Sequence, residues 1–236
     1  MLITSSTGTS KGLFRVSADG ETTSVAALAD KRVTCIESDG LYLWVGTKDG
    51  LWKYNTITEE TSLYTTAQGI GNNFINVLLV VDASVWVGTR GGLSKYDETT
   101  DTWHTYTEQD GLPNNNVQAI VYDSNRNSLW VGTPAGLAIF SIDKETFTTV
   151  LEDYNIKNIE ASGDSLWLST TTGMIQFDII NSTSKQHRSH PESEPLREWN
   201  VSNLVSDGDA LWFSNWSAST EGAIIRFDRR MNIWKR

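Results

Sequence analysis

Two short stretches separated by two residues decide the fold, Leu43-Trp44-Val45-Gly46-Thr47 and Gly50-Leu51-Trp52-Lys53-Tyr54-Asn55. The first stretch has five copies in the 236-residue chain, at residues 43–47, 85–89, 129–133, 166–170 and 211–215, and the last two copies carry more substitutions. The tryptophans of successive copies are 42, 44, 37 and 45 residues apart. A period of this length is typical of β-propeller blades or of helical solenoids.

The local pattern favours strands. The copies are short, rich in β-branched and aromatic residues, and bounded by Gly, Asn, Asp, Ser and Thr, with no apolar spacing of helical period. In the best-formed repeat, we expect strands at 116–121, 129–133, 136–141 and 147–150, joined by short turns. Each repeat is therefore predicted to be a four-stranded antiparallel blade.

The repeated strand is apolar on both faces, which predicts burial between neighbouring blades. We therefore interpret its tryptophans as core between blades. Glycine at the fourth position leaves a gap in mid-strand, and we expect the Trp of an adjacent blade to fill it. Acidic or amide side chains follow the next strand, where they can accept hydrogen bonds from turn amides, at Asn55, Asp97, Asp178 and Asp228.

The two ends of the chain set the blade count. Residues 2–6, 12–17 and 22–28 resemble the second, third and fourth strands of a blade whose first strand is missing, and 231–234 completes the last blade. We predict an all-β, six-bladed propeller in a single domain, 1–236, with one three-stranded and five four-stranded blades. The blades are expected at 1–30, 31–68, 69–110, 111–153, 154–192 and 193–236. A partner strand could add to the open edge of blade 1.

Composition limits the function classes. The chain is 39% hydrophobic and 20% charged and contains ten Trp, as expected for a folded protein. Its net charge of −10 repels phosphate backbones and anionic lipid, so we expect neither nucleic acid nor a membrane as partner. The sequence shows no signal peptide and no apolar run of membrane-spanning length. We expect a cytoplasmic or virion location unless the chain is exported as part of a larger protein.

Residues 181–199 form a longer and more polar connection than the others, and such loops often carry binding surfaces. His187 and His190 are three residues apart, but no third fixed ligand accompanies them, so we predict no metal site and no cofactor. Two tryptophans lie outside the repeat, where exposed contacts are more plausible than core. The predicted binding residues are His187, Arg188, His190, Trp199 and Trp216.

Four cations occupy the same position in the third strands of four repeats, at Arg15, Lys53, Lys95 and Arg226. They could form a ring that recognises an anion, but we favour solvated or ion-paired side chains in this acidic protein. The sequence has no set of paired carboxylates, nucleophile elbow or phosphate loop, so we predict that the protein is not an enzyme.

The pair Trp-Val-Gly-Thr and Gly-Leu-x-Lys-Tyr-Asp, with Asp110-Gly111-Leu112-Pro113-Asn114-Asn115-Asn116-Val117 before one copy, resembles the two-component regulator propeller repeat. The resemblance is strongest over residues 33–146, which include a second such element at 69–73. In later copies, Ser169 and Ser214 replace the glycine. The resemblance implies a β-propeller, as in the extracellular sensor regions of bacterial hybrid two-component regulators.

Four functions remain open at this point. The leading hypothesis is a non-enzymatic scaffold or interaction module that binds another protein or an assembly. A virion part, such as a phage tail or baseplate protein, is the second. The third is ligand sensing, with a glycan as the ligand, which the resemblance implies. A metal-dependent lyase is the weakest of the four.

Overall fold

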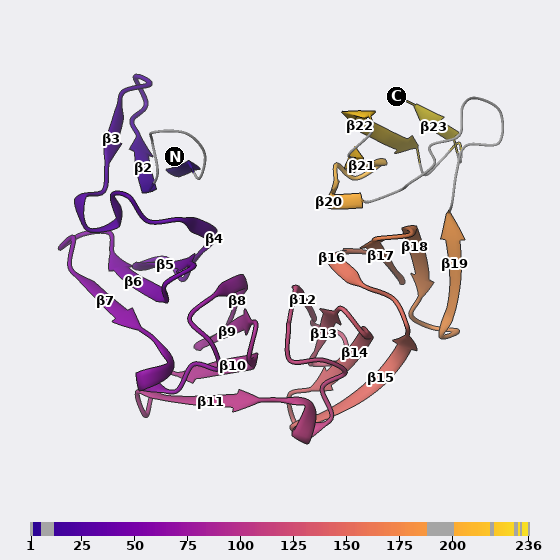
Figure 1. Cartoon of the computed structure of the whole chain (residues 1–236), viewed down its shortest axis with the longest axis horizontal. Coiled ribbons are helices and arrows are strands. Elements are labelled where there is room, and N and C mark those ends of the chain that lie inside the picture. The colour runs from indigo at the N-terminus through magenta and orange to yellow at the C-terminus, as the bar shows by residue number, and fades with distance from the viewer. Residues whose placement is uncertain are drawn as a thin grey trace. The chain divides into compact units, whose positions relative to one another are not determined.

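The computed structural model describes residues 2–5, 12–187, 201–217, 220–228, 231 and 233–235. Within them the chain forms strands β1 to β23 and three single-turn 3-10 helices, η1 (Ala26–Leu28), η2 (Thr66–Gln68) and η3 (Glu108–Asp110). The strands make six antiparallel sheets, named A to F in chain order (Figure 1). In these residues no helix is long and apolar enough to cross a membrane.

Sheets A to C come first in the chain. Sheet A contains β1 (Leu2–Ser5), β2 (Gly12–Val16) and β3 (Thr22–Ser24). Sheet B contains β4 (Val33–Ser38), β5 (Tyr42–Thr47), β6 (Leu51–Asn55) and β7 (Thr61–Tyr64). Sheet C contains β8 (Ile75–Val81), β9 (Ser84–Thr89), β10 (Gly92–Asp97) and β11 (Thr102–Tyr106).

Sheets D to F come next. Sheet D contains β12 (Ala119–Asp123), β13 (Ser128–Thr133), β14 (Gly136–Ser141) and β15 (Thr146–Glu152). Sheet E contains β16 (Ile156–Ser162), β17 (Ser165–Thr170), β18 (Gly173–Asp178) and β19 (Thr183–His187). Sheet F contains β20 (Val201–Ser206), β21 (Ala210–Ser217), β22 (Thr220–Asp228) and β23 (Ile233–Lys235).

Each sheet is a meander in which consecutive strands pair. The predicted propeller fold is confirmed, with one three-stranded and five four-stranded sheets among the described residues. Two predicted strand bounds differ from the structure by three residues or more. The first strand of sheet D begins at Ala119 rather than 116, because the amide of Val117 donates to the carbonyl of Thr89 instead (2.8 Å). In sheet A the last strand ends at Ser24, and η1 comes after it.

The chain divides into two compact units, Met1–Gln109 with Asn115–Val117, and Asp110–Asn114 with Gln118–Arg236. Sheets A to C belong to the first unit and sheets D to F to the second. Inside each unit, consecutive sheets lie side by side in chain order (Figure 1). That all six sheets make a single domain stays a prediction.

Three of the repeated tryptophans pack on the next sheet within their unit. The rings of Trp44 and Tyr96 are 5.4 Å apart, from sheet B to sheet C. In the second unit, Trp130 lies 5.8 Å from Phe177. Trp167 lies 5.4 Å from Phe227. The interpretation as core between blades is confirmed for these three tryptophans, which are almost fully buried, and it is wrong for Trp212 of sheet F, which is 36% exposed.

The gaps at the strand glycines are filled, but not by tryptophan as we expected. A Cβ on Gly46, Gly88 or Gly132 would lie 2.8, 2.7 or 2.7 Å from a methyl carbon of a β-branched residue in the connection to, or first strand of, the next sheet. Those residues are Ile75, Val117 and Ile156. The expectation was wrong because of the direction in which the tryptophans point. The Trp of the following sheet projects from that sheet's far face, away from the glycine gap of the preceding sheet.

Buried threonines fix the hairpin between the second and third strands. Thr47 Oγ1 donates to the carbonyl of Gly50 (2.7 Å) and accepts from the amide of Asp49 (3.1 Å). Gly50 has φ +135°, a value that favours glycine. The same bonds recur at Thr89, Thr133 and Thr170. The Thr and the following Gly of the repeated phrase are therefore explained by this turn.

The acidic and amide side chains after the third strands act as predicted. Asp178 Oδ1 accepts from the amides of Ile180 and Asn181, both at 2.9 Å. These hydrogen bonds, that of the Asn181 amide first, lower the pKa of Asp178. Asn55, Asp97 and Asp228 also accept from turn amides. Their role is to begin the turn into the last strand.

Candidate functional site

Around its tryptophan, sheet F has the same strand register as sheet E. Trp212 of β21 lies opposite Val205 on one side and Arg226 on the other. Its indole N–H donates to the Oδ2 of Asp207 (2.6 Å), as that of Trp44 does to Asp39 (2.8 Å). The strand is therefore a regular copy of the repeat, and its tryptophan has the same local anchor.

The environment of this tryptophan is different. Trp212 is 36% exposed, whereas Trp167, at the same position in sheet E, is 3% exposed. Ile224 of β22 is 68% exposed, and its counterpart Met174 is fully buried. Val205 is 58% exposed. We call this surface, defined by Val205, Trp212 and Ile224, the F face.

The F face is hollowed. A shallow depression of about 700 Å³ is lined by Val205, Trp212, Ser214 and Ile224, with two amide side chains at its rim, Asn158 and Asn203. The nearby Arg226 is neutralised by Asp228 at 3.1 Å and lies 5.7 Å from the ring of Trp212. The depression is therefore mainly apolar, with hydrogen-bonding groups at one border.

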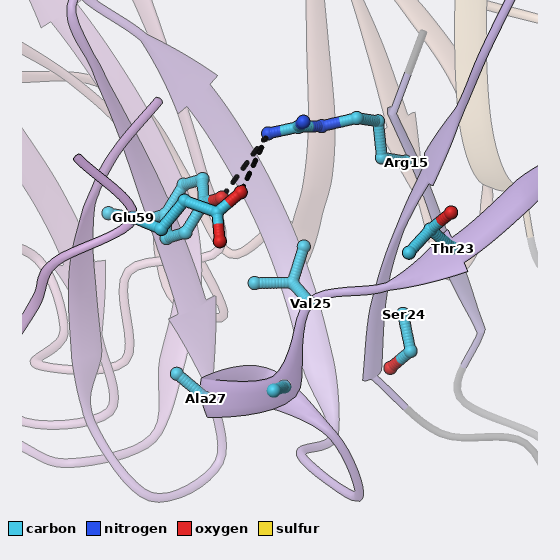
Figure 2. Close-up of a pocket in the computed structure, with 8 residues that line it drawn as sticks. Arg15, Thr23, Ser24, Val25, Ala27 and Glu59 are labelled. Carbon is cyan, nitrogen blue, oxygen red and sulfur yellow. Dashed lines mark hydrogen bonds and ion pairs between the residues drawn. The ribbon is translucent and has the colours of Figure 1, made fainter. Parts of the chain in front are cut away.

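A second, smaller cavity lies in the first unit, between sheets A and B. It measures about 350 Å³. In Figure 2 the side chain of Arg15 extends toward Glu59, with Val25 below the pair. Arg15 donates to the hydroxyl of Tyr54 at 3.3 Å and lies 3.7 Å from Glu59 Oε1. Thr23 and Ser24 add hydroxyls to a lining that also includes the apolar side chains of Val25, Ala26 and Ala27, so this cavity is mixed in character.

One known family shares part of this sequence. Residues 111–135 match the model of a family described as two component regulator propeller. The chain carries this propeller repeat. The resemblance inferred from the sequence is confirmed, and no curated protein matches the sequence significantly.

Solved structures share the repeat's fold. Two are extracellular domains of hybrid two-component systems from B. thetaiotaomicron. The first is 20% identical, with a TM-score of 0.72 over 88% of this chain and 30% of its own. The second is 17% identical, with a TM-score of 0.75 over 86% of this chain and 29% of its own. An ancestral GH74 enzyme is 13% identical, with a TM-score of 0.67 over 86% of this chain and 30% of its own. This chain thus spans about 30% of the length of these proteins.

The cations of the propeller repeat do not form a free ring. Lys53 lies 4.9 Å from the ring of Trp44 and 3.1 Å from Glu98 Oε1. Lys95 lies 5.4 Å from Trp86 in the same way. These cations therefore stack on the tryptophan across the strand pair, which supports the ion-paired interpretation over an anion-binding ring.

His187 is one of the five predicted binding residues, and it ends β19 half-buried. Its ring is 5.5 Å from that of Trp167 and 5.8 Å from that of Phe227. Burial, and then the charge of Lys185, lower its pKa. His187 thus packs in the interface between sheets E and F. Arg188, His190 and Trp199 lie outside the described residues, as does the side chain of Trp216 on β21.

The described residues contain no group of three or more His, Cys, Asp or Glu side chains that could hold a metal ion. Burial raises the pKa of Cys35 to about 12, so its thiol stays protonated at neutral pH and is a poor nucleophile. Burial also raises the pKa of Tyr96, whose hydroxyl donates to the carboxylate of the exposed Asp101. These pKa shifts result mainly from burial between packed sheets and do not indicate a reaction centre.

Sequence reasoning missed the F face because Trp212 belongs to the repeat and was interpreted as core. Its copy of the phrase differs from the first three, with Phe213, Ser214 and Asn215 in place of Val, Gly and Thr, but these substitutions do not indicate exposure of the tryptophan. The outward side chains Val205 and Ile224 carry no signal of their own, since aliphatic residues also occupy these positions in buried sheets.

Proposed function

We propose that this chain is a non-enzymatic propeller module that binds a protein partner through the F face. The observation that carries the proposal is the exposure of Trp212 and Ile224 at positions that are buried in sheet E. The tryptophan is held in a fixed orientation by Asp207, so its ring is pre-organised for contact.

The energetics favour a protein partner. Burying an exposed aliphatic side chain contributes up to about 1.5–3 kcal/mol, and tryptophan is among the residues that most often dominate binding energy. Apolar side chains that lie together on a soluble surface commonly mark interaction sites. The amide side chains at the rim, Asn158 and Asn203, can supply hydrogen bonds at the border of such an interface.

The test uses two matched variants, Ile224→Ser and Ile57→Ser. Both remove an exposed isoleucine, and Ile57 lies in a turn of sheet B and is not one of the residues of the F face. The full chain and both variants are purified from cells that naturally produce the protein, and co-purifying proteins are identified. We expect a partner that Ile224→Ser loses and Ile57→Ser keeps. Equal recovery with both variants would contradict the proposal, and a virion protein among the partners would support the virion hypothesis.

A second candidate function is recognition of a small polar ligand, such as a glycan, in the cavity at Arg15. The exposed pair of Arg15 and Glu59 is weak and can open at little cost, which frees a guanidinium, a carboxylate and the Tyr54 hydroxyl for a ligand. The extracellular origin of two similar structures is consistent with this role. Titration with an oligosaccharide panel tests it. Arg15→Ala should abolish any saturable binding, while Arg126→Ala, in sheet D, should not affect it.

A further inference from the structure

We propose that Lys48, Phe74 and Arg90 form a binding site for a ligand that carries two carboxylate groups. The three residues lie at one end of sheets B and C, within the first unit. They share no residue with the F face or with the cavity at Arg15. The inference therefore goes beyond the proposed function and does not rest on it.

Strand register brings the three side chains together. Ile75 of β8 pairs with Thr89 of β9, so Phe74, just before the one strand, and Arg90, just after the other, lie at the same end of sheet C. Cζ of Arg90 is 3.7 Å from the centre of the Phe74 ring. Nζ of Lys48, in the turn after β5 of sheet B, is 5.2 Å from the same centre. One ring thus holds two cations from neighbouring sheets.

The two cations lack an acidic partner. Both are exposed, and neither forms an ion pair or a hydrogen bond with any residue that the structure describes. Even Asp49, which follows Lys48 in the chain, forms no ion pair with it. Two like charges against one ring repel each other. An anion that contacts both Lys48 and Arg90 would relieve this repulsion.

These residues depart from the repeat, so the general packing of the fold does not account for them. Directly after the threonine of the phrase, sheets D and E have Pro134 and Thr171 in place of a cation. Directly before the β-branched residue that fills the glycine gap, the connections to these sheets have Asn116 and Asn155 in place of Phe74. Sheets D and E therefore form the same four-stranded meander without the two cations and the ring.

The ring and the turn that carries Arg90 are fixed against each other. The amide of Phe74 donates to Oδ1 of Asn72 at 2.8 Å, which holds the segment before β8 in a turn. The backbones of Gly71 and Gly91 are so close that a Cβ on either would collide with the other. Stacking on the ring also restricts the cationic side chains. Binding would therefore require little further ordering of the site.

The available donors favour carboxylates over phosphate. The amides of Asp49 and Gly91, in the two turns, already donate to threonine hydroxyls at 3.1 and 2.9 Å. Phosphate sites commonly draw on several free backbone amides, whereas the guanidinium fork alone satisfies a carboxylate through two parallel hydrogen bonds. Arg90 would bind one carboxylate in this way, and Lys48 would bind the other as a point charge.

The test is isothermal titration calorimetry of the full chain with succinate, glutarate and adipate at low ionic strength, where exposed charges are least screened. We expect saturable binding, weakened about tenfold or more by Arg90→Gln and by Lys48→Gln. The matched controls, Arg126→Gln and Lys144→Gln, remove exposed cations of sheet D and should bind as the natural chain does. Circular dichroism checks that every variant is folded.

Two further variants and a second anion test the assigned chemistry. Arg90→Lys keeps the charge but removes the planar fork, so it should bind more weakly than the natural chain. Phe74→Leu keeps an apolar side chain but removes the ring face that holds the cations, and it should also weaken binding. Inorganic phosphate should bind more weakly than the best dicarboxylate. Unchanged binding by Arg90→Lys, or tighter binding of phosphate, would overturn the assignment to carboxylates.

A short blocked peptide of two glutamates distinguishes the source of the carboxylates. Tighter binding of this peptide than of the free dicarboxylates would identify acidic side chains of a protein as the ligand, and weaker binding would identify a free small molecule. Absence of saturable binding by every probe, or equal binding by Arg90→Gln, Lys48→Gln and the controls, would overturn the inference. None of these outcomes bears on the F face, because its residues are unchanged in all the variants.

Discussion

Sheets E and F carry the same phrase on the same strand, and the two tryptophans have different environments. Trp167 lies under Phe227 and His187, whereas Trp212 is partly open to solvent. Both strands pair in the same register with their neighbours. The phrase therefore specifies a surface that can receive another sheet. The same phrase can therefore be part of a core, as in sheet E, or lie partly open to solvent, as in sheet F.

The largest expected difference between the two sheets concerns stability. Trp167→Ala should lower the free energy of unfolding of its unit by about 3–5 kcal/mol, because it leaves a cavity in the interface. Trp212→Ala should cost about 1 kcal/mol or less, since the ring is partly solvated already. Urea unfolding followed by circular dichroism measures both, with a test for two-state behaviour because the chain has two units. Equal losses would contradict the difference in burial.

The next largest loss of stability is expected at Gly132, where Ile156 of the next sheet fills the gap in the strand. Gly132→Ala should destabilise by about 1–3 kcal/mol, because the new Cβ meets Ile156. Ser214→Ala on the F face should change stability by about 0.5 kcal/mol or less. Combining Gly132→Ala with Ile156→Val should recover part of the loss, and this recovery distinguishes crowding from a change in strand propensity.

The sequence predicted the sheets, the turn acids and the buried tryptophans, because these depend on local periodicity and repeat. It did not predict that Ile156 fills the gap at Gly132, because this contact depends on how one sheet is positioned against the next. Nor did it predict the F face. Burial of Trp212 depends on a surface from outside its own repeat, and the composition of the strand is the same in either case.

The interface of sheets E and F should be sensitive to acid, in contrast to the F face. The pKa of His187 is lowered, so the folded state binds its proton less tightly than the unfolded state. The contribution of the neutral His187 to folding stability is fully present above the pKa of the unfolded state, about 6.5. It is lost as pH falls through the lower pKa of the folded state. His187→Gln should therefore lose less stability than the natural chain between pH 7.5 and 5.5. Identical pH dependence would exclude this role.

The smallest effects should come from the aspartates that hold the indoles. Asp39→Ala should cost about 1 kcal/mol, because it leaves the buried Trp44 without its acceptor. Asp207→Ala should cost less, since water can replace the acceptor at the exposed Trp212. Its main effect should be a weaker partner complex, from a less fixed ring. Thermal unfolding and partner recovery measure the two effects separately.

The most direct test of the central claim is a photo-crosslink from position 224 in cells that naturally produce the protein. A benzophenone amino acid is placed at 224, and at 57 as the control, and the linked peptide is mapped by mass spectrometry. We predict that position 224 links to a partner protein, and that position 57 does not link to the same protein. A link from 224 to this chain's own residues, or the same links from both positions, would contradict the account.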